Sequence, residues 1–405
     1  MTSDIRSATD GSHAAEFSPH RFPSYHRPFY PAVRNRFKPP EQWDQVEALY
    51  DSARYTETLE ALFDYIDTDL LKKFKGPEGM IVPHGSLTVF VQWDEQGFEV
   101  RAPFVRLPKT ARAPSLRQTL ELNFSTLMLA RLQLTGEELE FTYSCSLEEC
   151  EPSKIYAVLK EICINGDGYD DEFIRRLGSE RIMPVRARFP QADELGRVRQ
   201  VFNGIVEEAL QYVRFYERKR MFGYAMQFAG LFLKKIDYAV APQGRIRAEI
   251  EDAIERMNED LLPSVALGLV RDVFDQLSGL SVEEFTECVY QPGIFIPYRN
   301  LLTLNNLQQR LEETQKMART SLGNADFIGA ALAQGGVFYH LLYESDPPAP
   351  AIPLLEEGLE KASGLSWKEA ATVLRLQLQK ILELEEIGSG SEPPGTLTVQ
   401  EARNE

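Results

Sequence analysis

The spacing of apolar residues changes at about residue 190, and this change limits the chain to few architectures. Before it, segments with apolar residues at every second position alternate with segments in which they recur every three or four positions. After it, only the helical spacing continues, up to about residue 386. This order predicts an α+β fold: a sandwich of helices on an antiparallel sheet, followed by a mostly α-helical domain.

The strand signal is clearest in the middle of the first part. Ser86–Trp93 reads SLTVFVQW, the turn-like DEQG follows, and Phe98–Leu107 reads FEVRAPFVRL. β-Branched and aromatic residues on both sides of such a turn predict an antiparallel hairpin. Pro103 has no backbone N–H, so we expect the second strand to be bulged or at an edge there.

Helices are expected on both sides of this hairpin. One covers Gln42–Lys73, a second begins with Ser115 as its N-cap and runs through Met128, and a third covers Ser153 to about Leu177. Two short strands, Leu129–Leu134 and Leu139–Ser144, separate the second helix from the third. Antiparallel strands with helices on one face form a common two-layer arrangement.

We divide the chain into four segments from these patterns. They are an arm that we expect to be disordered or extended (1–42), an α+β domain (43–185), a helical domain (190–387) and a tail rich in Gly, Ser and Pro that we expect to be disordered (388–405). The helical domain has amphipathic stretches at about 194–238, 245–278, 281–290, 301–320, 324–343, 352–363 and 366–386. They could form tetratricopeptide-like hairpins, although no 34-residue repeat is evident.

The arm interleaves aromatic and cationic residues between Phe17 and Lys38. Such a pattern can stack on nucleobases. It can also dock its aromatic residues on the folded body of the same chain, which is the interpretation that we favour. Its prolines favour an extended backbone in both cases.

Charge and apolar runs exclude several classes of protein. Asp and Glu number 61 against 44 Lys and Arg, a formal charge of −17. Such a surface repels phosphate backbones, so nucleic-acid binding is unlikely for the chain as a whole. No run of about 18 apolar residues predicts a membrane span, and the N-terminus does not resemble a secretory signal. Four cysteines without a C-x-x-C pair suit a reducing cytoplasm.

A search for catalytic motifs finds none of the common phosphate-binding, hydrolase or zinc-protease patterns. Only His84 and His340 lie in the predicted folded body, and Cys145 and Cys150 with His84 form the only Cys/His combination inside one domain. We expect these cysteines to be structural and His340 to be a satisfied core or interface residue. The sequence therefore predicts a non-enzyme without a cofactor.

Two groups of residues could hold a metal ion. Asp167, Asp170, Asp171 and Glu172 resemble a loop for a hard cation, but acids also favour the first turn of a helix, and we prefer that interpretation. His13, His20 and His26 could bind a transition metal, but we expect solvated side chains in a flexible arm. We predict no metal site.

The helical domain contains one dense basic patch and one aromatic run. Phe215–Phe232 could line a ligand pocket, but core packing is the favoured interpretation. The basic patch is usually a solvated helix face, and if functional it would receive an acidic client segment or a nucleic-acid phosphate. Its members are Arg214, Arg218, Lys219 and Arg220.

The element order of residues 45–180 resembles the YbjN family and the related type III secretion chaperone fold. A helix at Tyr55–Ile66 precedes the hairpin, and the next helix contains Leu122-Asn123. The strand pair within LMLARLQLTGEELEFTYSCSLEE and the closing helix SKIYAVLKEICINGDGYDDEFIRRL complete the likeness. It covers about a third of the chain.

This resemblance implies a dimerising platform without catalytic chemistry, which holds an unfolded client segment. We therefore expect a chaperone-like protein that binds a client by strand addition and apolar pockets. The alternative is a scaffold or regulatory subunit whose helical domain does the recognising. For the first hypothesis, the helical domain supplies a second docking surface or drives oligomerisation. We expect partner contacts at the aromatic residues of the hairpin and at the basic patch: Phe90, Trp93, Phe98, Phe104, Arg214, Arg218, Lys219 and Arg220.

Overall fold

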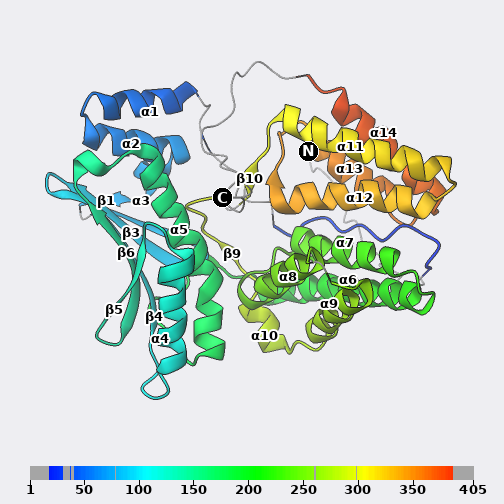
Figure 1. Ribbon diagram of the computed structural model, residues 1–405, viewed down its shortest axis with the longest axis horizontal. Coiled ribbons are helices and arrows are strands. Elements are labelled where there is room, and N and C mark those ends of the chain that lie inside the picture. The colour runs from blue at the N-terminus through cyan, green and yellow to red at the C-terminus, as the bar shows by residue number, and fades with distance from the viewer. Residues whose placement is uncertain are drawn as a thin grey trace, which may run out of the picture.

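The computed structural model of the protein describes residues 18–30, 37, 41–77, 79–259, 261–297 and 299–385. It confirms the α+β class, with an antiparallel sheet in the N-terminal half and a largely helical C-terminal region (Figure 1). We call residues 41–181 the first part and residues 192–382 the helical region. The predicted tail, residues 388–405, lies outside the described residues.

The sheet of the first part has the strand order β1-β2-β3-β4-β6-β5, and β7 pairs with β4. The predicted hairpin is β3 and β4, with Val91 opposite Val100. The register of β4 against β6 shifts between Pro103 and Val105, which confirms the expected bulge. The strands are β1 (Lys75–Gly76), β2 (Gly79–His84), β3 (Leu87–Asp94), β4 (Gly97–Arg106), β5 (Arg131–Thr135), β6 (Glu138–Cys145) and β7 (Glu180–Arg181).

The helices of the first part cover one face of this sheet, where a single apolar core joins them to the strands (Figure 1). The opposite face carries polar side chains, among them Glu99, Arg101 and Glu140. The helices are α1 (Glu41–Asp51), α2 (Tyr55–Ile66), α3 (Leu70–Phe74), α4 (Ala113–Glu121) and α5 (Pro152–Asp171). The π-helical turns η1 (Leu122–Thr126) and η3 (Glu172–Arg176) extend α4 and α5, and η2 (Leu147–Glu149) is a 3-10 turn.

Two expectations about these helices were wrong. The single helix predicted over Gln42–Lys73 is three helices, and the first break contains Ala53 at a positive φ of 56°, which a helix cannot contain. Ser115 is not an N-cap, because α4 begins at Ala113 with Pro114 in its first turn. Ser115 is instead a buried residue inside the helix.

The helical region consists of two groups of helices, one above the other in Figure 1. The lower group is α6 (Ala192–Arg218), α7 (Phe222–Val240), α8 (Gly244–Met257), α9 (Pro263–Ser278) and α10 (Val282–Glu287). The upper group is α11 (Leu304–Gly323), α12 (Phe327–Glu344), α13 (Ile352–Ala362) and α14 (Trp367–Leu382). Helices α7 and α12 pack together and join the groups. None of these described helices is both long and apolar enough to cross a membrane.

The helical region differs from expectation at two of the predicted stretches. The stretch 194–238 is two helices, because the chain turns at Arg220, whose φ is +57°. The stretch 245–278 is also two helices, α8 and α9. The favoured role of Phe215–Phe232 in core packing is confirmed, since Phe228 and Phe232 are fully buried in the helical core.

Residues 18–30 of the arm lie between the two helical groups, as the dark blue trace in Figure 1 shows. Phe22 and Tyr30 are buried in the helical core. Phe37 stacks instead on Tyr65 of the first part, with ring centroids 5.6 Å apart. The favoured prediction, that the arm docks on the protein's own body, is therefore confirmed for the described arm residues.

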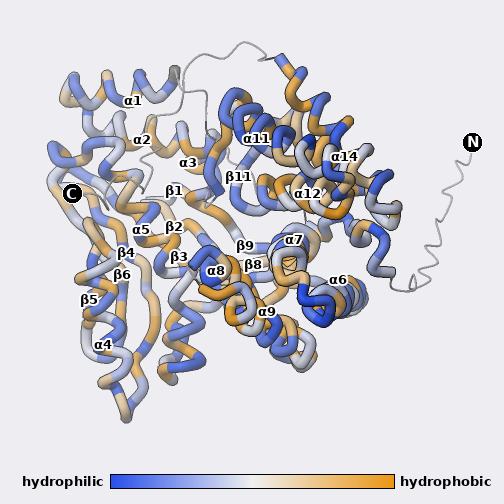
Figure 2. Tube along the Cα trace, turned by 45° about the vertical axis from the view of Figure 1, so that its right-hand side comes forward, coloured by the Kyte–Doolittle hydropathy of each residue, from blue (hydrophilic) through white to orange (hydrophobic). Residues whose placement is uncertain are grey.

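A short segment of the helical region enters the core of the first part. We call residues 291–297 the strap. Its Phe295 and Ile296 are buried among residues of the sheet and of α2, and their N–H groups donate to His84 Nδ1 at 3.2 and 3.3 Å. The strap begins with β9 (Gln291–Pro292), which pairs with β8 (Ala187–Arg188) between the sheet and α7 in Figure 2. After the strap, β10 (Asn300–Leu301) pairs with β11 (Ser345–Asp346).

The turn before β3 predicts a specific response to substitution. Gly85 has a φ of +54°, its N–H donates to Gly293 O of the strap, and a Cβ there would lie 1.9 Å from Asp167 Oδ1. Gly136 has a φ of +66° but nothing within 4 Å of an added Cβ. We expect Gly136→Ala to lower the free energy of unfolding by about 1 kcal/mol and Gly85→Ala by roughly 2 kcal/mol more. Urea unfolding measures both, and equal losses would contradict the tight packing at Gly85.

Candidate protein-binding surface

The predicted partner-binding residues do not form one surface. The expectation for Phe98 and Phe104 was wrong, because both side chains are buried on the face of the sheet that the helices cover. Trp93 lies on the same face and stacks on Phe63, with ring centroids 5.3 Å apart. Phe90 points to the opposite face, where it lies opposite Arg101 and is partly buried.

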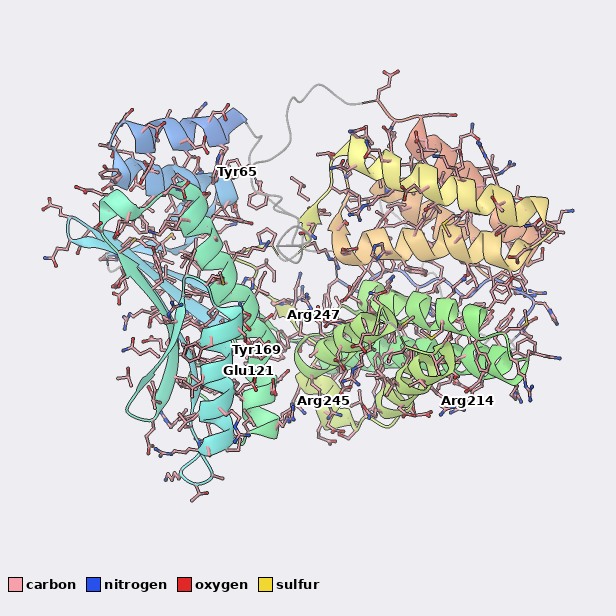
Figure 3. All side chains as sticks on the ribbon, viewed as in Figure 1. Tyr65, Glu121, Tyr169, Arg214, Arg245 and Arg247 are labelled. Atoms are coloured by element: carbon pink, nitrogen blue, oxygen red, sulfur yellow. The ribbon has the colours of Figure 1, made fainter. Side chains whose placement is uncertain are left out.

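The basic patch lies on the helical region, away from the sheet, as the label of Arg214 in Figure 3 shows. Its four side chains are exposed near the end of α6 and in the turn that follows. Arg214 pairs with Asp275 at 2.8 Å, and Lys219 Nζ lies 5.9 Å from the ring centre of Phe215. The sheet aromatics and this patch therefore cannot contact one short segment together.

A different set of apolar side chains is exposed on α4, on η1 and just after η1. Leu120 of α4 and Phe124 of η1 are 56% and 87% exposed, and Met128, which follows the extended C-cap residue of η1, is 78% exposed. We call these three residues the α4 stripe. Leu122 and Leu127 of the same segment are buried in the core. The prediction of one amphipathic helix missed the stripe, although apolar residues on two opposite faces were a signal for it.

Polar contacts fix the segment that carries the stripe. The Asn123 side chain donates to Leu132 O and accepts from Leu132 N–H, both at 2.9 Å. The Glu161 carboxylate of α5 accepts the N–H groups of Met128, Leu129 and Ala130 at 2.9 to 3.0 Å. The stripe is therefore held on a defined backbone, which lowers the entropy lost when a partner binds.

The hydrogen bonds between Asn123 and Leu132 also limit binding by strand addition. An incoming strand needs free N–H and C=O groups at the edge of the sheet. At the β5 edge, both groups of Leu132 are occupied by Asn123. At the other side, β1 has two residues, and Pro83 of β2 has no N–H. A partner can therefore contact the exposed side chains of the stripe, whereas the backbone of Leu132 cannot pair with an added strand.

A pocket of about 310 Å³ lies where the two parts meet, with Arg247 of α8 at the junction in Figure 3. Two ion pairs line it: Asp237 with Arg299 at 3.3 Å, and Glu251 with Arg247 at 2.8 Å. Burial raises the pKa of the Asp237 carboxyl. The Asp237–Arg299 pair joins α7 to the residue before β10, whereas the Arg247–Glu251 pair lies within α8.

His84 also lines this pocket. Its Nδ1 accepts two backbone N–H groups of the strap, and burial lowers its pKa to about 3. The side chain is therefore neutral near pH 7, and its unprotonated nitrogen is already engaged. This geometry gives His84 a structural role in joining the two parts.

The first-turn interpretation was wrong for Asp167, Asp170 and Asp171, which lie at the C-terminal end of α5. Glu172 alone lies in a first turn, that of η3. Asp167 accepts the N–H of Ser86 at 2.6 Å, Asp170 pairs with Arg181, and Asp171 lies 3.8 Å from Arg175. Within the described ranges, no three His, Cys, Asp or Glu residues are placed to hold a metal ion.

Among the described residues, four other Cys and His side chains that the sequence singled out contact protein groups: Cys145, Cys150, His340 and His20. Cys150 is buried, with its Sγ 3.6 Å from Cys145 Sγ, and His340 pairs with Glu344 at 2.6 Å. His13 lies outside the described residues. His20 packs edge-on to Phe215, while His26 is partly buried and its pKa falls to about 4, so His26 is not the solvated residue that we expected.

The contact between His84 and the strap predicts a pH effect on stability. The pKa of His84 is about 3 in the folded protein and near 6.5 when exposed, so the unfolded chain binds more protons between these values. His84→Asn keeps an acceptor at the position of Nδ1 but cannot titrate there. From pH 7.5 to pH 5, we expect wild type to lose about 2 kcal/mol of unfolding free energy relative to the variant. Urea unfolding at both pH values tests this, and a difference that does not change with pH would contradict it.

Comparison with known proteins identifies no family for this chain. No model of a protein family matches the sequence, and no curated protein matches it either. The likeness to YbjN and the type III secretion chaperones thus stays a prediction from element order.

Proposed function

We propose that the protein is a non-enzymatic, chaperone-like protein that holds an apolar segment of a client polypeptide on the α4 stripe. The observation that carries this proposal is the exposure of Phe124 and Met128, 87% and 78%, on a segment fixed by Asn123 and Glu161. Large apolar side chains on a rigid, exposed backbone are typical of surfaces that bind other proteins.

The stripe has the composition of a binding site for varied segments. The flexible thioether of Met128 adapts to different partners, and the Phe124 ring supplies a large contact area. Glu121, labelled on α4 in Figure 3, and Arg117 are exposed beside Leu120 and provide a polar rim. Burial of the three apolar side chains would contribute about 5 kcal/mol, so micromolar binding needs further contacts from the client.

The position of Leu120 and Phe124 on one helical segment favours a helical client segment. They are four residues apart on α4 and η1, and such a pair can pack against the apolar face of a second helix. A client helix with apolar residues along one face fits this surface. The closed β5 edge at Leu132 is a second reason to prefer a helix over an added strand.

The element order of the first part also supports a chaperone-like function. Helix α2, the β3–β4 hairpin, α4, the β5–β6 pair and α5 follow one another as in the family that the sequence resembles. The second candidate function is recognition of a partner by the helical region. It is supported by residues 18–30 of the arm, an extended segment that is bound there.

The double variant Phe124→Glu/Met128→Glu tests the proposal. Both side chains are exposed, so we expect the unfolding free energy to change by less than about 0.5 kcal/mol. The matched control is Met317→Glu on α11, where Met317 is 64% exposed. Polypeptides retained by each purified protein are identified by mass spectrometry, and the main one is then purified for reconstitution. We expect at least tenfold weaker binding of it by the double variant and no change for the control.

Three outcomes would contradict the proposal. Binding by the double variant would place the client site elsewhere, and equal loss in Met317→Glu would indicate non-specific adhesion. The third outcome is self-association, which sedimentation velocity measures. If wild type only self-associates, and the double variant is monomeric, the stripe is a homodimer interface and not a client site.

A further inference from the structure

The helical region already holds an extended peptide, which is Ser18–Tyr30 of the same chain (Figure 1). The backbone of Phe22 donates to Leu365 O at 2.8 Å and accepts from Gly364 N–H at 3.1 Å. The N–H of Phe29 donates to Ala239 O at 3.0 Å. The extended segment is thus held by its backbone at both ends, between the loop that precedes α14 and the end of α7.

The floor of this site is aromatic. Tyr212, Phe228 and Trp367 pack together, with Tyr212 stacked on Phe228 at 4.6 Å and Trp367 edge-on to Phe228 at 5.7 Å. Trp367 Nε1–H donates to Pro19 O at 3.1 Å, and the Tyr212 hydroxyl donates to Arg21 O at 2.7 Å. An aromatic floor with donors directed at the carbonyl groups of a proline-rich segment is a known mode of peptide recognition.

The ring of Phe22 packs against Gly335, where a larger residue would collide with it. Phe22 is buried, and a Cβ added at Gly335 of α12 would lie 2.5 Å from its ring. The next residue, Gly336, has nothing within 4 Å of an added Cβ. The space above Gly335 is therefore shaped to hold the aromatic ring of Phe22.

Polar groups of the site bind Ser24 in the middle of the peptide and the positive charge of Arg27. The Glu208 carboxylate accepts Ser24 N–H and Oγ–H at 2.8 and 2.7 Å, and it pairs with the fully buried Lys235 at 2.8 Å. Glu360 of α13 pairs with Arg27 of the arm at 2.8 Å. Acidic groups on the site thus meet a basic peptide.

Each of these contacts joins the arm peptide to residues far away in the sequence. The two helical groups also contact one another directly through α7 and α12. A tether raises the local concentration of a bound segment, so even modest affinity keeps it in place.

We infer that this arm groove, defined by Glu208, Tyr212, Gly335, Glu360 and Trp367, is a recognition site for partner segments. Its ligand is an extended segment of another protein with prolines, an aromatic anchor and arginine, the chemistry of residues 18–30. Such a segment binds in exchange for the arm. The inference concerns the helical region and is independent of the α4 stripe.

A labelled peptide with the sequence of residues 18–30 tests the inference by fluorescence anisotropy on the full chain. Phe22→Ala weakens the arm and leaves the groove intact, so we expect this variant to bind the peptide at least tenfold more tightly than wild type does. Adding Gly335→Ala to it is expected to weaken binding at least tenfold, whereas adding Gly336→Ala has no effect. Because loss of Phe22 can impair folding, Arg27→Glu provides a second weakened arm that changes only an exposed ion pair.

Three results would overturn the inference. One is a peptide that binds neither the Phe22→Ala nor the Arg27→Glu variant, which would make the arm a permanent part of the core. Another is an equal effect of the two glycine substitutions, since binding would then occur outside the groove. The last is self-association of wild type that Gly335→Ala abolishes, which would make a second copy the occupant.

Discussion

The arrangement of the two parts depends on one contact, in which two backbone N–H groups of the strap donate to His84 inside the core of the first part. Phe295 and Ile296 lie among the side chains of the sheet and α2, and the buried, neutral His84 accepts both of their N–H groups. Without this acceptor, the strap would bury unpaired polar groups at a cost of about 1–3 kcal/mol each. The adjacent turn at Gly85 donates to the strap as well.

Because the strap joins the two parts, the two surfaces that we propose for recognition lie on one frame. The first part carries an exposed apolar stripe whose backbone is fixed by Asn123 and Glu161. The helical region carries an aromatic groove occupied by the arm. These surfaces differ in chemistry, since the stripe suits an apolar helix and the groove suits a basic, proline-rich segment. A protein that binds through both could bring a client and a regulatory partner together.

Periodicity in the sequence predicted the fold class and the hairpin, because burial imposes a period of two on strands and 3.6 on helices. It could not predict which face the helices cover, and so it placed Phe98 and Phe104 on a binding surface. The outward residues of α4 were missed because Leu122 and Leu127 alone explain an amphipathic helix. The strap has no period at all, since its two buried residues follow an irregular stretch after Pro292. Contacts between residues distant in sequence, such as Asn123 with Leu132 or Phe295 with His84, follow only from the assembled fold.

Hydrogen–deuterium exchange tests the central claim most directly, by comparing the protein alone with its complex with the polypeptide that it retains on purification. Binding through the α4 stripe predicts slower exchange in α4, η1 and the N–H groups of residues 128–130, with little change in the outer helices α9 and α11. Protection confined to the helical region, or no difference between the two samples, would contradict the assignment of client binding to the first part.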